Sequence, residues 1–160
     1  MIAPTLFLVC GKIASGKSTK AAELANRPFT VLIAEDDWLS VLFGKEMMTI
    51  ADYVRCSAKL KAAIGPHVVS LLNEGVSVVL DFPANTVADR AWLLGVAKEA
   101  GVAHELHFMD HSDETCLARL HERNGSGEHP FAVTDAQFAQ ITAHFVLPST
   151  DEGLEVVVHG

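Results

Sequence analysis

Cysteine is scarce in this chain, and its three copies, Cys10, Cys56 and Cys116, lie far apart. An odd number of cysteines without a Cys-x-x-Cys pair fits neither a disulfide framework nor a zinc site, and it is typical of a reducing compartment. Long apolar runs are also missing, since none approaches the roughly 18 residues of a membrane-spanning helix. The N-terminus lacks the basic segment that begins a signal peptide. We therefore expect a cytoplasmic protein without membrane contact.

Positive charge is sparse as well. The chain has 12 Lys and Arg against 20 Asp and Glu, which gives a net charge of −8 with neutral histidines. A field of this sign repels a phosphodiester backbone, so nucleic acid is disfavoured as a partner, and a small anion must be held by a local cluster of cations. The 160 residues, 49% of them hydrophobic, suffice for one core. We expect a single domain over residues 1–160.

Short apolar runs alternate with longer helical patterns, which is typical of parallel βαβ units in an α/β fold. Strands are predicted at Thr5–Val9, Thr30–Ile33, Val76–Leu80, His104–Met109 and Leu154–Val158. Helices are predicted from Lys17 to Asn26, from Glu35 onward, over Ala51–Asn73 with a break at Gly65–Pro66, from Thr86 to Ala100, from Ser112 to Arg123, and over Asp135–His144. The composition of Asn124–Gly127 predicts a mobile loop.

One motif carries clear chemistry. The segment Gly11–Ser18 reads GKIASGKS, and it matches the pattern GxxxxGK[ST] between a predicted strand and a predicted helix. In such a loop, successive backbone N–H groups point at phosphate oxygens. We expect ATP and Mg²⁺ as cofactors, with Lys17 on the β- and γ-phosphates and the Ser18 hydroxyl on Mg²⁺. The residues expected to bind the nucleotide are Gly11, Lys12, Ile13, Ala14, Ser15, Gly16, Lys17, Ser18 and Thr19.

Carboxylates follow the second and third predicted strands. Because the carboxyl ends of parallel strands face the ligand crevice, Asp36 or Asp37 could accept the proton of an attacking hydroxyl. The same cluster could instead serve only the helix dipole. Asp81 closes an apolar strand, where it could hold Mg²⁺, position the substrate, or be a simple polar strand end. The residues after the acidic cluster have the spacing of a helical core face at Trp38, Leu42 and Phe43.

Two arginines, Arg119 and Arg123, lie one helical turn apart beside the Gly-Ser-Gly segment. This spacing makes them candidates for a lid that closes over a triphosphate and stabilises the transferring charge. The alternative is an exposed helix face on which they pair with Glu122 or Asp113. Arg90 is a weaker candidate for the site.

The sequence does not decide the roles of several other polar residues. Tyr53 and Arg55 could reach an acceptor or cover the core. The eight histidines show no compact ligand spacing, so we expect no histidine metal site. His107, His121 and His129 could line the lid.

Together, these residues resemble the small P-loop kinases. The resemblance is closest to the bacterial kinase group often labelled AAA-family ATPase, which is similar to the kinase half of polynucleotide kinase, to zeta toxin and to chloramphenicol phosphotransferases. It covers nearly the whole chain, through Gly11–Thr19, Glu35–Gly44, Val78–Thr86, Arg119–Asn124 and Pro148–Gly153.

The resemblance implies a five-stranded parallel sheet of order 2-3-1-4-5 between helices, with an arginine-bearing lid. It also implies that Asp36 is the general base, that Arg119 and Arg123 belong to the lid, and that Lys17 and Ser18 form the phosphate–Mg²⁺ pair. Related kinases often carry an arginine three residues after the base, where this chain has Leu39. This departure favours a less anionic acceptor.

Three functions remain on these grounds. The first is a kinase that transfers the γ-phosphate of ATP–Mg²⁺ to a hydroxyl of a small molecule. The second is a nucleotide-dependent regulatory ATPase module that has no small-molecule acceptor and is recognised by a partner protein. The third is a nucleic-acid 5′-hydroxyl kinase, which the net charge and Leu39 disfavour.

Overall fold

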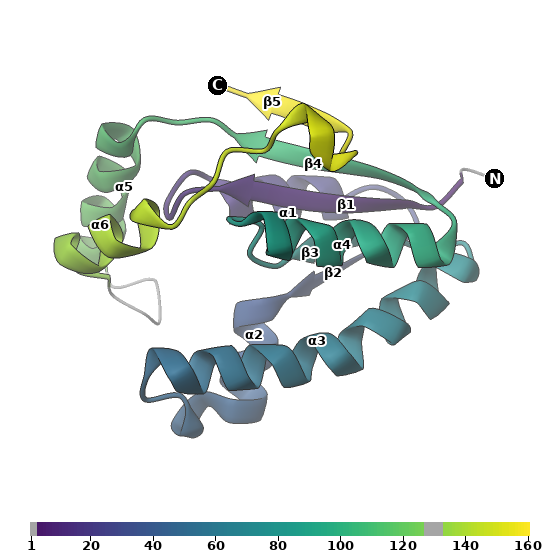
Figure 1. Cartoon of the computed structure of the whole chain (residues 1–160), viewed down its shortest axis with the longest axis horizontal. Coiled ribbons are helices and arrows are strands. Elements are labelled where there is room, and N and C mark those ends of the chain that lie inside the picture. Colours follow the sequence, from purple (N-terminus) through teal and green to yellow (C-terminus); the bar gives the residue numbers. More distant parts are fainter. Residues whose placement is uncertain (1–2, 127–132) are drawn as a thin grey trace.

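The computed structural model describes residues 3–126 and 133–160. Its five strands form one parallel sheet in the order β2-β3-β1-β4-β5, which confirms the expected order (Figure 1). The strands are β1 (Thr5–Gly11), β2 (Thr30–Ala34), β3 (Ser77–Asp81), β4 (Ala103–Met109) and β5 (Val156–His159). The last strand therefore begins two residues later than the predicted Leu154.

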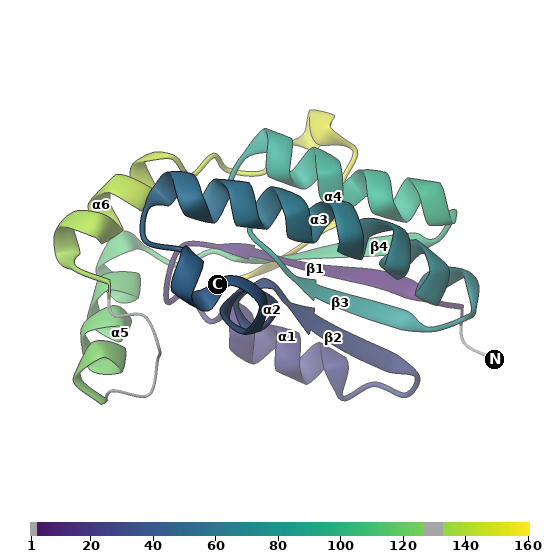
Figure 2. The ribbon, with the colours of Figure 1, turned by 90° about the horizontal axis from the view of Figure 1, so that it is seen from below.

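Helices cover both faces of this sheet. They are α1 (Lys17–Ala25), α2 (Glu35–Phe43), α3 (Ile50–Asn73), α4 (Val87–Ala100), α5 (Asp113–Ser126) and α6 (Asp135–Ala143), with the 3₁₀ turns η1 (Gly44–Glu46) and η2 (Thr150–Glu152). Figure 2 shows α3 and α4 side by side across one face, with α1 on the other. Helices α5 and α6 lie at the end of the sheet opposite the N-terminus, where the strands point (Figure 1).

The core forms because β1 is buried on both faces. Leu6, Leu8 and Cys10 pack in the cluster with α3 and α4, whereas Phe7 and Val9 pack with α1. Alternate residues of a strand point to opposite faces, so this run of apolar residues fills two layers at once.

Helix α3 corrects the predicted break at Gly65–Pro66, because it runs through both residues for 24 residues in all. A helical proline leaves the carbonyl of the residue four positions earlier without its N–H partner. Here that residue is Ala62, which is exposed and can bind water instead. The buried face, which includes Ile64 and Val68, holds both halves of the helix on the sheet.

Two further expectations were wrong. Helix α5 includes Asn124–Ser126, which had been predicted as loop; Gly127 lies outside the described residues. The Asn124 amide donates to the Val133 carbonyl over 2.7 Å, so a contact distant in sequence stabilises this end of the helix. In α2, Trp38 and Leu42 are 42% and 52% exposed and not in the core, whereas Leu39 is 2% exposed and Phe43, as predicted, packs partly buried against the core.

Arg90 is a structural residue of the core. Its guanidinium is fully buried and donates over 2.8 Å to the carbonyls of Ala84 and Val146. It also forms two bonds to the Glu152 carboxylate, of 2.8 and 3.1 Å, and these bonds hold the pKa of Glu152 below its usual range. The network ties the segment after α6 to the loop after β3.

His107 belongs to the sheet. Its ring is 5% exposed and packs against Phe7, while Nδ1 lies 2.9 Å from Nε2 of His159 and Nε2 lies 2.9 Å from the Glu105 carboxylate. Burial lowers the pKa of His107, Glu105 opposes this shift, and His159 and Lys20 add to it. The neutral ring therefore joins β4 to β5.

We expect Arg90→Met to lower the free energy of unfolding by about 3 kcal/mol or more, because it removes the cationic partner of a nearly buried carboxylate and the guanidinium donor of two carbonyls. Urea unfolding measures the loss. The matched control is Arg55→Met, which removes an exposed ion pair with Asp52 and should change stability little. Equal losses in the two variants would contradict a dominant role for the buried network.

We also expect the stability contribution of His107 to depend on pH. Since the folded protein holds the pKa of His107 below its ordinary value of 6.5, the unfolded chain binds this proton first. The contribution is present above about pH 6.5 and is lost as the pH falls through the folded pKa. In His107→Gln, the free energy of unfolding measured with urea should change less between about pH 7.5 and 5.5 than in the parent protein. His67→Gln, on an exposed site of α3, is the control, and a full pH dependence in His107→Gln would refute the assignment.

Candidate active site

The loop between β1 and α1 has the backbone of an anion-binding nest. Ala14 and Gly16 adopt positive φ angles of 61° and 100°, which turn successive N–H groups toward one side. Gly11 must be a glycine because a Cβ there would overlap Ser15 Oγ and lie 3.1 Å from the Met109 carbonyl oxygen. Ser15 is 1% exposed and closes the turn through its N–H, which donates to the Lys12 carbonyl over 3.1 Å.

The loop leads into the N-terminus of α1. Gly16 occupies the N-cap position, and within the described chain no side chain caps this end of the helix. The first N–H groups of a helix have no partner inside it, so they remain free for an anion, which the helix dipole also favours. The loop and the helix end therefore present backbone donors together.

Asp81 lies beside this loop because β3 is the direct neighbour of β1. The Ser18 hydroxyl donates to Asp81 Oδ2 over 3.2 Å. Burial raises the pKa of Asp81, while Lys17 and the Ser18 hydrogen bond oppose the shift. Burial lowers the pKa of Lys17, while Asp81 and Asp36 favour its charged form. The Lys17 ammonium and the Asp81 carboxylate therefore each favour the charged form of the other.

The donor set at Ser18 and Asp81 fits Mg²⁺, which prefers oxygen ligands and usually keeps several waters and substrate phosphates in its coordination shell. Among the described residues, no group of three or more His, Cys, Asp or Glu side chains could hold a metal by itself. A cation here would therefore depend on phosphate and water ligands as well as on these two residues.

Asp36 and Asp37 lie in the first turn of α2, which begins directly after β2. In the sheet register Ala34 is the partner of Asp81, so the first turn of α2 starts next to the end of β3. Both side chains are exposed. Asp36 favours the charged forms of Lys17 and Arg123, and both aspartates raise the pKa of Asp81. Asp36 thus interacts electrostatically with Lys17 and with Arg123 of α5.

The two arginines of α5 differ in their surroundings. Arg119 Nη1 donates to the Ser15 carbonyl over 3.3 Å, which places its guanidinium on the phosphate-binding loop. Arg123 is half-buried, burial lowers its pKa, and its Nε is a buried donor without a partner in the described chain. Neither arginine forms an ion pair with another described residue, and Asp113 pairs with Lys12 over 2.5 Å.

The sequence did not indicate the role of Glu35. This carboxylate is 2% exposed and accepts hydrogen bonds from the Tyr53 hydroxyl and, over 2.9 Å, from the Ser57 hydroxyl. Burial raises the pKa of Glu35, and the two hydrogen bonds oppose that shift. The spacing of Glu35 and Leu39, one turn apart on α2, was the available signal that both face inward.

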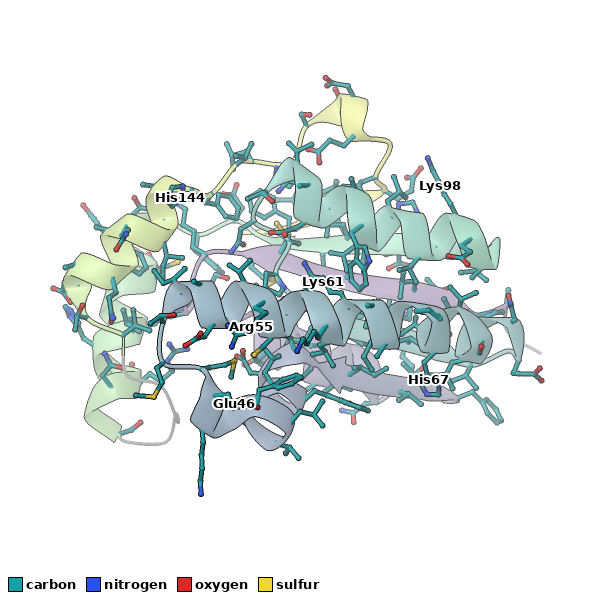
Figure 3. The ribbon with its side chains drawn as sticks, turned by 60° about the horizontal axis from the view of Figure 1, so that its bottom comes forward. Glu46, Arg55, Lys61, His67, Lys98 and His144 are labelled. Carbon is teal, nitrogen blue, oxygen red and sulfur yellow. The ribbon has the colours of Figure 1, made fainter. Side chains whose placement is uncertain are left out.

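The sequence left the roles of Arg55, His121 and His129 undecided. Arg55 forms an exposed pair with Asp52 over 3.0 Å, and Figure 3 shows it on α3 together with Lys61. His121 bonds to Asp135 over 2.6 Å and so joins α5 to α6. His129 lies outside the described residues. Over the part of the chain that is described, no helix has both the length and the apolar character to cross a membrane.

Comparison with known proteins places the fold. A family model described as AAA domain matches residues 6–148. A candidate kinase from Chloroflexus aurantiacus superposes with a TM-score of 0.75 at 19% identity, over 99% of this chain and 86% of that chain. A sugar kinase from Janibacter sp. HTCC2649 gives 0.64 at 15% identity, over 98% and 84%.

A chain of the Pnkp1/Rnl/Hen1 RNA repair complex also gives a TM-score of 0.64, at 19% identity over 90% of this chain and 44% of that chain. Among curated proteins, no significant match is found. At these identities the structural likeness shows a shared fold.

Proposed function

Because this chain belongs to the AAA domain family and has a P-loop kinase-like fold, we propose that it transfers the γ-phosphate of ATP–Mg²⁺ to a hydroxyl of a small molecule. One observation carries the proposal. The exposed Asp36 carboxylate interacts electrostatically with Lys17 of the phosphate-binding loop and with Arg123 of α5. A base, a phosphate cradle and a cation at one edge of a sheet are what phosphoryl transfer requires.

The phosphate-binding loop holds the donor. Backbone N–H groups of the loop, apart from that of Ser15, which donates to the Lys12 carbonyl, and those of the first turn of α1 bind phosphate oxygens, and Lys17 contacts the β- and γ-phosphates. Ser18 and Asp81 would hold Mg²⁺, which would neutralise part of the phosphate charge. Arg119, already on the loop, adds positive charge beside the phosphates.

Asp36 acts on the acceptor. Its carboxylate accepts the proton of the acceptor hydroxyl while that oxygen forms a bond to the γ-phosphorus. The bond from the γ-phosphorus to its bridging oxygen breaks, and ADP leaves. Arg123 stabilises the charge on the transferring group from the α5 side. Phosphate is conserved in this step, and the proton passes to Asp36.

Charge favours a neutral acceptor. Helix α2 presents Asp36 and Asp37 and has no basic residue, and Leu39, where related kinases often have arginine, is buried in the core. The likeness to a sugar kinase supports a small hydroxyl compound, whereas the likeness to an RNA repair protein keeps a 5′-hydroxyl end as an outcome to be tested. The net charge of −8 opposes the latter.

We expect Lys17→Ala to abolish ATP binding or turnover, because it removes the cation that contacts the phosphates. Calorimetric titration with ATP–Mg²⁺ measures affinity, and ADP release measures turnover. Lys59→Ala, which removes an exposed lysine of α3, is the matched control and should behave as the parent protein. Unchanged affinity and turnover in Lys17→Ala would rule out the binding of ATP by this loop.

We expect Asp36→Asn to retain ATP binding and to reduce acceptor-dependent ADP release by about 10²- to 10⁴-fold, because the base is lost and the phosphate cradle stays. Asp37→Asn, the adjacent carboxylate, should have a much smaller effect. The acceptors to compare are sugars and sugar alcohols, a pool of hydroxyl metabolites, and an RNA oligonucleotide with a 5′-hydroxyl.

Each result has a distinct meaning. Stimulation by the oligonucleotide alone would replace the small acceptor by a nucleic-acid end. No stimulation by any acceptor, together with a protein captured only in the presence of nucleotide, would replace the kinase by a regulatory module. Full activity of Asp36→Asn would remove Asp36 from the role of base.

A further inference from the structure

The carboxylate next to the proposed base is buried and doubly hydrogen-bonded. Glu35 is 2% exposed, and it directly precedes the exposed Asp36. One of its oxygens accepts from the Tyr53 hydroxyl and the other accepts from the Ser57 hydroxyl over 2.9 Å. Both donors belong to α3, one helical turn apart, so a single face of α3 holds both carboxylate oxygens.

Helix α2 needs such support. It has only nine residues, its N-cap residue is Ala34, and no side chain of the described chain caps it. Isolated helices of this length are unstable in water, so the position of the first turn depends on contacts with other elements. The buried residues of α2 are Glu35 and Leu39. Leu39 contributes apolar packing, which is non-directional, whereas the bonds of Glu35 fix an orientation.

The donors keep their protons. Burial, followed by the Glu35 charge, raises the pKa of Tyr53 above its ordinary value, so its hydroxyl stays a donor at all physiological pH values. Loss of either donor would leave a buried carboxylate oxygen without that hydrogen bond, which is unfavourable for a charged group away from water. The turn would then shift toward water, and Asp36 would move with it.

Helix α3 is a rigid support. A capping box fixes its N-terminus, since Thr49 Oγ1 accepts from the Asp52 N–H over 3.1 Å and the Asp52 carboxylate accepts from the Thr49 N–H over 3.2 Å. Further along, Cys56 and Leu60 are each 2% exposed in the main core. Tyr53 and Ser57 thus project from an anchored helix.

We propose that Tyr53 and Ser57 hold Glu35 so that the first turn of α2 presents Asp36 to the acceptor hydroxyl, which makes all three positioning residues for phosphoryl transfer. The inference rests on the proposed function. A displacement of a reacting group by about 1 Å can cost about 10²-fold in rate, so a side chain that touches no substrate can still control turnover.

The test uses ATP–Mg²⁺ hydrolysis by the purified full chain, with water as the acceptor. We expect Tyr53→Phe and Ser57→Ala each to lower kcat by about 10-fold with an unchanged KM for ATP, because the phosphate cradle is untouched. Glu35→Gln, which keeps the shape and one acceptor oxygen, should retain more activity than Glu35→Ala. Arg55→Gln is the matched control, since it lies between the two donors on α3, pairs only with Asp52 in the described chain and should leave kcat unchanged.

A second measurement does not need turnover. Hydrogen exchange at the Leu39 and Ser40 amides, which bond to the carbonyls of the first turn of α2, should be faster in Tyr53→Phe and Ser57→Ala than in the parent protein. Exchange in α1 should stay the same. Unchanged exchange in α2 would overturn the proposal, whatever the activity.

Asp36→Asn, assayed in parallel, separates the two levels of inference. If it lowers kcat and Tyr53→Phe does not, the positioning role is wrong and the proposed base stands. If Asp36→Asn leaves kcat unchanged, the proposed function fails in its choice of base, and hydrogen exchange still decides whether Tyr53 and Ser57 hold the turn. A lower Tm in Tyr53→Phe with the parent kcat and KM would mark a purely structural contact and overturn the proposal.

Discussion

The pairing of β1 with β3 on one side and β4 on the other is the constraint from which the candidate site follows. β1 is apolar on both faces, so it is stable only at the centre of a sheet that helices cover on both sides. Its neighbours then run parallel to it, and their carboxyl ends meet at one edge. Asp81 comes to the phosphate-binding loop in this way, although 63 residues separate it from Ser18, with which it bonds.

The charges at that edge explain how an acidic protein could hold the anionic nucleotide of the proposed function. The chain carries a net charge of −8, yet several of its cations gather here. Lys17 follows the phosphate-binding loop, Arg119 bonds to the Ser15 carbonyl of that loop, and Asp36 favours the charged forms of Lys17 and Arg123. Local charge acts over a few ångströms with little screening, whereas the net charge acts through solvent and salt. Local charge therefore determines whether phosphates can be held at this edge, and net charge determines which larger partners approach the protein.

Local patterns predicted much of this molecule. The phosphate-binding loop and the five strands follow from residues adjacent in the sequence, and the strand order followed from the family resemblance. The errors have tertiary causes. Pro66 does not end α3, because burial of Ile64 and Val68 outweighs one lost hydrogen bond. Asn124 remains helical because it bonds to Val133.

The interior polar contacts were also beyond local patterns. Glu35 looked like one of three equivalent acids at a helix start, and only α3 distinguishes it, through donors 18 and 22 residues away. Arg90 looked like a weak site candidate, and its partners lie up to 62 residues away. A single sequence shows which residues are polar, but the partners of a buried polar group depend on how the elements pack.

Helices α1 and α2 differ from the other helices in how they begin, and the Ser112 hydroxyl accepts from the Thr115 N–H at the start of α5. Threonine side chains cap α3, α4 and α6, at Thr49, Thr86 and Thr134. In contrast, α1 and α2 begin directly at the edge of the sheet, and within the described chain no side chain caps either of them. A cap on α1 would occupy the N–H groups that a phosphate needs. On α2, Glu35 accepts hydrogen bonds from α3, and Asp36 is exposed and is the base of the proposed function. The local stability that these two helices lack must therefore come from packing, which is why contacts distant from the chemistry can control it.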